Sequence, residues 1–193
     1  MKTTPYPPSG YLKNRYASSA FQKLPNLLPF SQGAPQTNHR GEASLKSRPE
    51  VRFFEGKDAI KAIYKDIILT LSVEKGSRKE YLCISCGTDI HTIDPTAQPE
   101  FVKKRLKKGI PIRWIAPEKD RKLIWYKTQK QEMRRMKFIN DKKYPFHMEI
   151  SIYGDSVALW SLEDQKPSIV IFENQLMASS MRSFFNFLWD SIK

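Results

Sequence analysis

Residues 147–161 read HMEISIYGDSVALWS. Polar and apolar residues alternate through much of this stretch, as in a strand that turns one face toward a core. The pair Gly154-Asp155 interrupts the run, and a glycine beside an aspartate between two apolar runs indicates a tight hairpin turn. We therefore predict two antiparallel strands, at 147–153 and 156–162. A sheet that contains this hairpin cannot be wholly parallel.

Upstream of this hairpin, strand-like and helix-like segments alternate. A helix between Gly56 and Gly76 is predicted from apolar residues at helical spacing, namely Ile60, Ile63, Tyr64, Ile67, Ile68 and Leu71. The other predicted upstream elements are strands at 50–54, 81–86, 110–116 and 135–139 and helices at 99–108 and 119–133. Such alternation favours parallel strands joined by right-handed crossovers.

Downstream of the hairpin, residues 167–173 form another predicted strand. The continuous apolar run 169–172 suggests burial on both faces. A last amphipathic helix begins after Asn174, a residue type that caps helix N-termini. The predicted fold class is α/β (α+β), with a mixed sheet flanked by helices on both faces.

The first 48 residues differ from the rest. They carry many Pro, Ser, Asn and Gln residues and show no sustained period, so they cannot bury enough apolar surface to offset the entropy of ordering. We predict a disordered basic arm at 1–48 and one ordered domain at 49–193.

The chain has 193 residues and a formal net charge of +13. Residues 99–143 hold 16 basic and 5 acidic side chains, and such an excess favours anionic partners, DNA among them. The candidate nucleic-acid contacts are Lys103, Lys104, Arg105, Lys107, Lys108, Arg134 and Arg135, with Trp125 and Tyr126 as candidate stacking residues. The sequence shows neither a bilayer-spanning run nor a signal peptide, so we expect a cytoplasmic protein without membrane contact.

Several short stretches in this order resemble the C-terminal sensor domain of TrmB-family transcriptional regulators. They are VRFFEGKDAI at 51–60, GIPIR at 109–113, IYGD at 152–155, IVIFE at 169–173 and the Phe185–Trp189 spacing. The resemblance implies a phospholipase D-like fold without catalytic residues, a sugar-like effector and a homodimer. Family members carry a winged helix ahead of this domain, and residues 1–48 show no such pattern.

The resemblance also gives residues 147–155 a chemical interpretation. In the phospholipase D superfamily the corresponding motif is His-x-Lys-x4-Asp. Here Glu149 takes the place of the lysine and Asp155 lies one position late. A carboxylate at the phosphate-binding position would repel the substrate. We therefore expect a non-catalytic domain that needs no cofactor, in which His147, Glu149 and Ser161 line a pocket for a small polar effector.

Two alternatives stay open at this point. One is a phosphodiesterase or nuclease of the phospholipase D superfamily that works from a dimeric site, although His39 and His91 offer no second motif. The other is a nucleic-acid-binding module without sequence preference. Cys83 and Cys86 form a Cys-x-x-Cys pair, but a zinc site needs about four ligands and no second pair exists. We therefore predict no metal site and interpret both cysteines as buried small residues.

Overall fold

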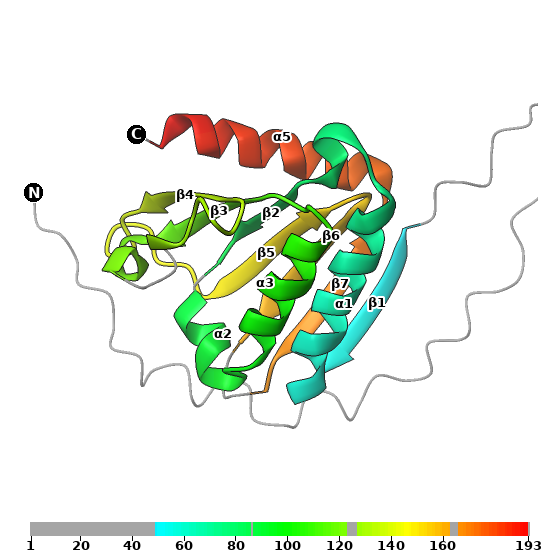
Figure 1. Ribbon diagram of the computed structural model, residues 1–193, viewed down its shortest axis with the longest axis horizontal. Coiled ribbons are helices and arrows are strands. Elements are labelled where there is room, and N and C mark those ends of the chain that lie inside the picture. Colours follow the sequence, from blue (N-terminus) through cyan, green and yellow to red (C-terminus); the bar gives the residue numbers. More distant parts are fainter. Residues whose placement is uncertain (1–48, 86, 123–126, 163–165, 193) are drawn as a thin grey trace, which may run out of the picture. The chain divides into compact units, whose positions relative to one another are not determined.

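The computed structural model describes residues 49–85, 87–122, 127–162 and 166–192. The predicted arm at 1–48 and the candidate stacking residues Trp125 and Tyr126 lie outside these ranges. Within them, one mixed sheet has the strand order β1-β7-β6-β5-β2-β3-β4 (Figure 1). The strands are β1 (Glu50–Glu55), β2 (Tyr81–Ile84), β3 (Ile112–Pro117), β4 (Arg134–Ile139), β5 (Met148–Tyr153), β6 (Ser156–Ser161) and β7 (Ser168–Glu173).

Both kinds of strand pairing occur in this sheet. Strand β2 pairs in parallel with β3, and β3 with β4, while β5, β6 and β7 form an antiparallel set that joins the parallel part through β5 and β2. The predicted mixed sheet is therefore confirmed. The prediction of parallel crossovers from the alternating strands and helices was wrong for the first strand. Strand β1 lies at the sheet edge against β7, and three strands separate it from β2, so the first crossover does not join neighbouring strands.

Helices cover both faces of the sheet, as predicted (Figure 1). Helices α1 (Lys57–Val73) and α3 (Ala97–Lys107) lie on one face, and α5 (Gln175–Ser191) lies on the other. All six apolar positions predicted for the inner side of α1 are buried. Helix α5 begins where expected, because the Asn174 side chain accepts a hydrogen bond of 3.0 Å from the Met177 amide.

The β5–β6 hairpin turns on Gly154 and Asp155, since Tyr153 pairs with Ser156. Gly154 has a φ of +52°, in the left-handed region that glycine adopts readily. A Cβ atom at this position would lie 2.6 Å from Cγ2 of Thr70 on α1. The glycine therefore serves both the turn and the close approach of α1.

The structure differs from the predictions between β2 and β4. Helix α2 (Gly87–Ile93) was not predicted. The predicted helix at 119–133 is in its first part a 3-10 helix, η3 (Glu118–Lys122), and residues 128–133 form turns. A second short 3-10 helix, η2 (Gly76–Lys79), follows α1. On β7, Ile169 and Ile171 are buried, whereas Val170 and Phe172 are half-buried, so the run is less enclosed than predicted.

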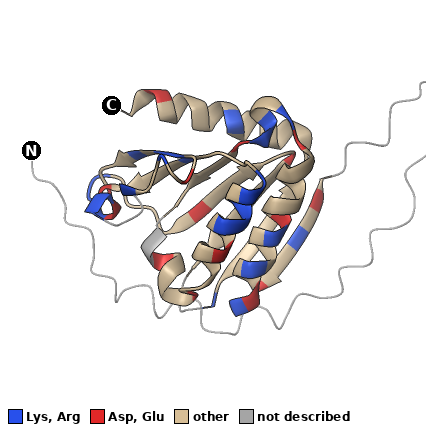
Figure 2. Cartoon of the chain, in the orientation of Figure 1, with Lys and Arg blue, Asp and Glu red and all other residues tan. Residues whose placement is uncertain are grey.

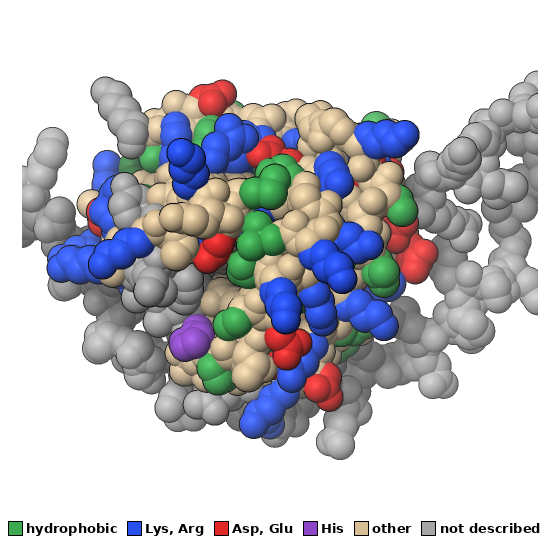
Figure 3. All heavy atoms as spheres, in the orientation of Figure 1, with side chains coloured by type: hydrophobic (Ala, Val, Ile, Leu, Met, Phe, Trp, Pro, Cys, Tyr) green, Lys and Arg blue, Asp and Glu red, His purple; other side chains and the backbone are tan. Residues whose placement is uncertain are grey.

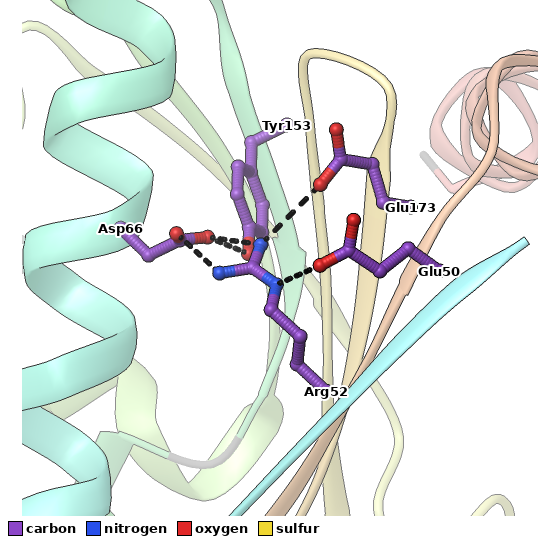
Figure 4. A network of polar contacts seen from close by, with 5 residues as sticks. All are labelled: Glu50, Arg52, Asp66, Tyr153 and Glu173. Atoms are coloured by element: carbon purple, nitrogen blue, oxygen red, sulfur yellow. Dashed lines mark hydrogen bonds and ion pairs between the residues drawn. The ribbon is translucent and has the colours of Figure 1, made fainter.

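A polar network ties edge strand β1 to the body of the domain (Figure 4). Arg52 donates from both terminal nitrogens to the Asp66 carboxylate on α1, at 2.8 and 3.2 Å. The Tyr153 hydroxyl on β5 donates to the same carboxylate at 2.7 Å. Glu173 lies 3.6 Å from the Arg52 guanidinium. The hydrogen bond to Asp66 raises the pKa of Arg52, in line with a persistent ion pair.

Candidate ligand-binding site

Successive side chains of β5 point to opposite faces of the sheet, and every second one faces α1 and α3. Glu149, Ser151 and Tyr153 point to this face and are buried, and Glu149 pairs across the ladder with Trp160. Only 2% of the Glu149 surface is exposed. A carboxyl group in such a position needs polar partners to offset its lost hydration.

The Glu149 carboxyl group is only half satisfied. Its Oε1 accepts hydrogen bonds from the Tyr81 hydroxyl at 2.8 Å and from Ser151 Oγ at 3.0 Å. Tyr81 and Ser151 also share a 2.7 Å hydrogen bond with each other. Its Oε2 is buried and has no hydrogen-bond partner among the described residues. An unsatisfied buried oxygen costs about 1–3 kcal/mol, so the unpaired Oε2 reduces the stability of the folded state.

Burial shifts the protonation of this group. Loss of hydration raises the pKa of Glu149 from 4.5 to about 7, although the hydrogen bonds from Tyr81 and Ser151 and the nearby Ser85 hydroxyl, which lies outside hydrogen-bond geometry, act in the opposite direction. Burial likewise raises the pKa of Tyr64, Tyr81 and the Cys83 thiol, which are neutral neighbours of the carboxyl group at neutral pH. Strongly shifted groups of this kind gather at functional sites.

Glu149 lies on the wall of a cavity of about 630 Å³, a size typical of small-molecule sites. Three aromatic rings pack together along it. Phe101 on α3 stacks on Tyr64 at 4.2 Å between ring centroids and meets Tyr81 edge-on at 5.7 Å. The exposed residues His91 and Lys103 also line it. The remaining lining residues are Cys83, Ser85, Ile90, Gln98, Pro99, Val102, Arg105, Leu106, Ile112, Trp114, Glu132 and Arg134.

The same cavity also has a cationic group of residues. Arg105 on α3 is fully buried and donates to the backbone oxygens of Ile110 and Glu132, both at 2.5 Å. Arg134 at the start of β4 forms an ion pair with the Glu132 carboxylate and lies over the Trp114 ring. Burial lowers the pKa of both arginines to about 10, so both remain charged at neutral pH.

The backbone between these charged residues is strained. Met133, which separates Glu132 from Arg134, has a φ of +49°, a conformation that costs a non-glycine residue about 1–2 kcal/mol. The Met133 backbone oxygen accepts a hydrogen bond from the Ile112 amide on β3, which holds the turn in place. Strain of this kind concentrates at functional sites.

The structure separates the three residues predicted to share a pocket. Glu149 lines the cavity. Ser161 is exposed and pairs with Met148 on the opposite side of the sheet, because neighbouring strand residues point to opposite faces. His147 is exposed just before β5 and is not among the cavity-lining residues. Of the three residues predicted to line one pocket, only Glu149 lines the observed cavity.

Of the basic residues predicted to contact nucleic acid, some are exposed and others are buried in the interior. Lys103, Lys104 and Lys107 on α3 and Lys108 at its C-terminal end are exposed. Figure 2 marks Lys and Arg positions along α1 and α3, and Figure 3 shows Lys and Arg side chains on this face. Arg105 and Arg134 were predicted for the same surface and lie in the interior instead. Arg135 is exposed and pairs with Glu80. One signal could have revealed Arg105: it follows Ala97 and Phe101 at four-residue steps, and all three are buried.

Neither a metal site nor a membrane-spanning helix occurs within the described ranges. No group of three or more His, Cys, Asp or Glu side chains there could hold a metal ion. Cys83 is a buried free thiol, and Cys86 lies outside the described residues. Among the helices that the structure describes, none combines the length and apolarity that a bilayer crossing requires.

Comparison with protein-family models gives no match, and comparison of the sequence with curated proteins gives none either. Solved structures do match. NucT from Helicobacter pylori superposes with a TM-score of 0.53 and 11% identity, over 75% of this chain and 98% of that one. Nuc from Salmonella typhimurium, a phospholipase D family member, gives 0.50 and 11%, over 76% and 97%.

TrmBL2, an archaeal chromatin protein with a novel mode of DNA binding, gives a TM-score of 0.49 at 11% identity. The match covers 78% of this chain and 56% of TrmBL2, so the chain spans little more than half the length of that protein. The likeness to NucT and Nuc shows the fold: the described residues adopt a phospholipase D-like architecture.

Proposed function

We propose that this domain is a non-catalytic binding domain on a phospholipase D-like fold, and that its ligand is a small molecule held in the cavity around Glu149. One observation carries the proposal. Glu149 lines a cavity of small-molecule size, and its buried Oε2 has no hydrogen-bond partner in the described structure. A ligand that donates a hydrogen bond to Oε2 recovers the free energy that the empty site lacks.

Two features support the absence of phosphodiester chemistry. The residue at the position of the superfamily lysine is Glu149, which lines the cavity, and a carboxylate there would repel a phosphate. The candidate nucleophile His147 lies outside the cavity and is exposed. A histidine nucleophile needs a neighbouring group that activates it and a cation that stabilises the transferred phosphoryl group.

The biological setting of the proposal comes from sequence. The resemblance of 51–60, 109–113 and 152–155 to TrmB-family sensor domains favours effector sensing in transcriptional regulation. The aromatic rings of Tyr64, Tyr81 and Phe101 on the cavity wall suit the apolar faces of a sugar-like effector. A homodimer stays a prediction from that resemblance.

Thermal unfolding of the purified chain against a panel of sugars and metabolites tests the proposal. Binding to the folded state raises its stability by about 2.7 kcal/mol at a ligand concentration of about one hundred times Kd. We expect at least one compound to raise the unfolding temperature of the wild type and of the Ser161→Ala variant, and to have a smaller effect on Glu149→Gln. Turnover of bis(p-nitrophenyl) phosphate that disappears on His147→Ala would contradict the non-catalytic assignment.

One observation favours a second function beside the first. The three exposed lysines of α3 and Lys108 at its C-terminal end present a positive surface, and Lys61 and Lys65 of α1 border the adjoining groove of about 250 Å³. Positive charge on adjacent helices suits contacts with nucleic-acid phosphates. We propose that this surface gives the domain DNA affinity with no sequence preference.

A further inference from the structure

The cavity carries two charged groups of residues at different places in the sheet. Glu149 belongs to β5, whereas Arg134 begins β4, and the sheet order β5-β2-β3-β4 separates these strands by three steps. Each step is about 4.8 Å, so strands β5 and β4 lie about 14 Å apart. The register adds an offset along the strands, because Ile150 is level with Lys137 and Arg134 lies three residues before Lys137. Within the described residues, no ion pair joins Glu149 to Arg105 or Arg134. The carboxyl and guanidinium groups therefore form two distinct ends of one site.

The guanidinium end has more positive than negative charge. It contains Arg105, Arg134 and the Glu132 carboxylate, which pairs with Arg134. Arg105 is bonded to two backbone oxygens but has no carboxylate partner in the described structure, and its Nε is buried without a hydrogen bond. The two guanidinium groups also repel each other, which contributes to the lowered pKa of Arg134. An anionic group would relieve this repulsion, and guanidinium geometry suits carboxylate or phosphate.

The carboxyl end has the opposite requirement. Glu149 is surrounded by Tyr64 of α1, by Tyr81 and Cys83 of β2 and by Ser151 of β5. These groups are neutral at neutral pH, so no cation among the described residues balances the carboxylate. A ligand amine would supply both the missing charge and the missing donor to Oε2.

We propose that the ligand of this cavity carries an amine at one end and a carboxylate or phosphate at the other, with the amine at Glu149 and the anion at Arg105 and Arg134. This inference rests on the proposed binding function and replaces the sugar-like effector implied by the resemblance with a ligand that carries both charged groups. Between the ends, the rings of Tyr64, Tyr81 and Phe101 provide an apolar wall for the middle of such a molecule.

Matched probes of one carbon skeleton test the two-ended site. They are 6-aminohexanoate, hexylamine, hexanoate and the neutral hexane-1,6-diol, with 4-aminobutanoate and 8-aminooctanoate as length variants and glucose as a neutral sugar. Affinities are measured by isothermal titration calorimetry on the full chain. We expect one amino acid of the series to bind about tenfold or more tightly than the amine or acid of equal length.

Variants assign each end of the ligand. Glu149→Gln should reduce the affinity for the amino acid to that for the simple acid, and Arg134→Gln should reduce it to that for the simple amine. Ser161→Ala, on the opposite face, should leave every affinity unchanged. Because Arg134→Gln also frees Glu132, its fold is checked by circular dichroism, and the probe series decides the question without that variant.

The outcomes separate this inference from the proposed function. Equal binding of amine, acid and amino acid overturns the two-ended site, as does binding of glucose or the diol without a gain from the charged ends, while the binding function stands. If no probe, sugar or metabolite binds, both fail.

Discussion

Glu149 is a carboxyl group that the domain keeps in its interior at a cost in folding free energy. Its pKa is raised from 4.5 to about 7, a difference that corresponds to about 3 kcal/mol at pH values above the folded pKa. The folded state binds this proton more tightly than the unfolded state. The stability is therefore undiminished below about pH 4.5, falls as the pH rises toward 7, and levels off above it.

The variant Glu149→Gln should remove this dependence. We expect the free energy of unfolding to exceed that of the wild type by about 3 kcal/mol at about pH 8 and to equal it near pH 4.5. Urea unfolding at both pH values measures the difference. The exposed Glu55 provides the matched control, because Glu55→Gln should leave the wild-type profile unchanged. A variant that is less stable than the wild type at the higher pH would contradict the account.

At the scale of elements, the β5–β6 hairpin and α1 meet at Gly154. In Gly154→Ala the new Cβ adds a clash with Thr70 to the cost of a left-handed backbone, about 3 kcal/mol in all. Gly76 has a φ of +57° and open space around it. In Gly76→Ala only the cost of the left-handed backbone therefore applies, about 1 kcal/mol. Thr70→Ser removes the clashing Cγ2 and should bring the loss at Gly154 close to that at Gly76. Urea unfolding of this set checks the expectation, and no rescue by Thr70→Ser would refute the steric part.

Strand β1 depends on a second contact with α1. Arg52→Met leaves the largely buried Asp66 carboxylate with its hydrogen bond from Tyr153, and we expect a loss of about 1–3 kcal/mol. The double variant with Asp66→Asn should lose less stability than the sum of the losses in the two single variants, because the two residues contact each other. Glu50→Gln is the control, since its 4.0 Å ion pair with Arg52 is exposed and contributes under about 1 kcal/mol. Strictly additive losses at Arg52 and Asp66 would show that the ion pair does not hold β1.

Local signals predicted most of these elements. The alternation around Gly154, the helical spacing from Ile60 to Leu71 and the cap at Asn174 are properties of neighbouring residues, and the structure confirms all three. The failures involve contacts distant in sequence. Nothing local to β1 indicates that it pairs with β7, and the basic run around Arg105 resembles a solvated helix face although Arg105 bonds to the backbone of residues 110 and 132.

The candidate site was predictable only in part for the same reason. The prediction that Glu149 stands at the lysine position of the phospholipase D motif identified the strand that carries one end of the cavity. The other end of the cavity comes from α3 and from the turn before β4, which only the tertiary fold brings near. Ser161 was misplaced because β6 was predicted without its register, and a shift by one residue moves a side chain to the other face.

At the scale of the whole molecule, the positive surface on α3 should govern any association with nucleic acid. Replacing Lys104, Lys107 and Lys108 by Gln should weaken DNA binding and reduce the dependence of log K on log salt by about 0.9 for each phosphate contact removed. Fluorescence anisotropy with duplexes of different sequence at several salt concentrations measures both. Gln at the exposed Lys130 is the control. An unchanged salt dependence in the triple variant would place DNA contacts elsewhere.

The proposed binding function depends on an unpaired carboxyl group in a cavity that a ligand can enter. The most direct measurement is a carbon-13 NMR titration of the Glu149 carboxyl group, with and without a compound that stabilises the chain. We expect a pKa of about 7 in the free protein and a lower value once an amine-bearing ligand is bound, because the opposite charge favours the carboxylate. An ordinary pKa near 4.5, unmoved by the ligand, would contradict the account.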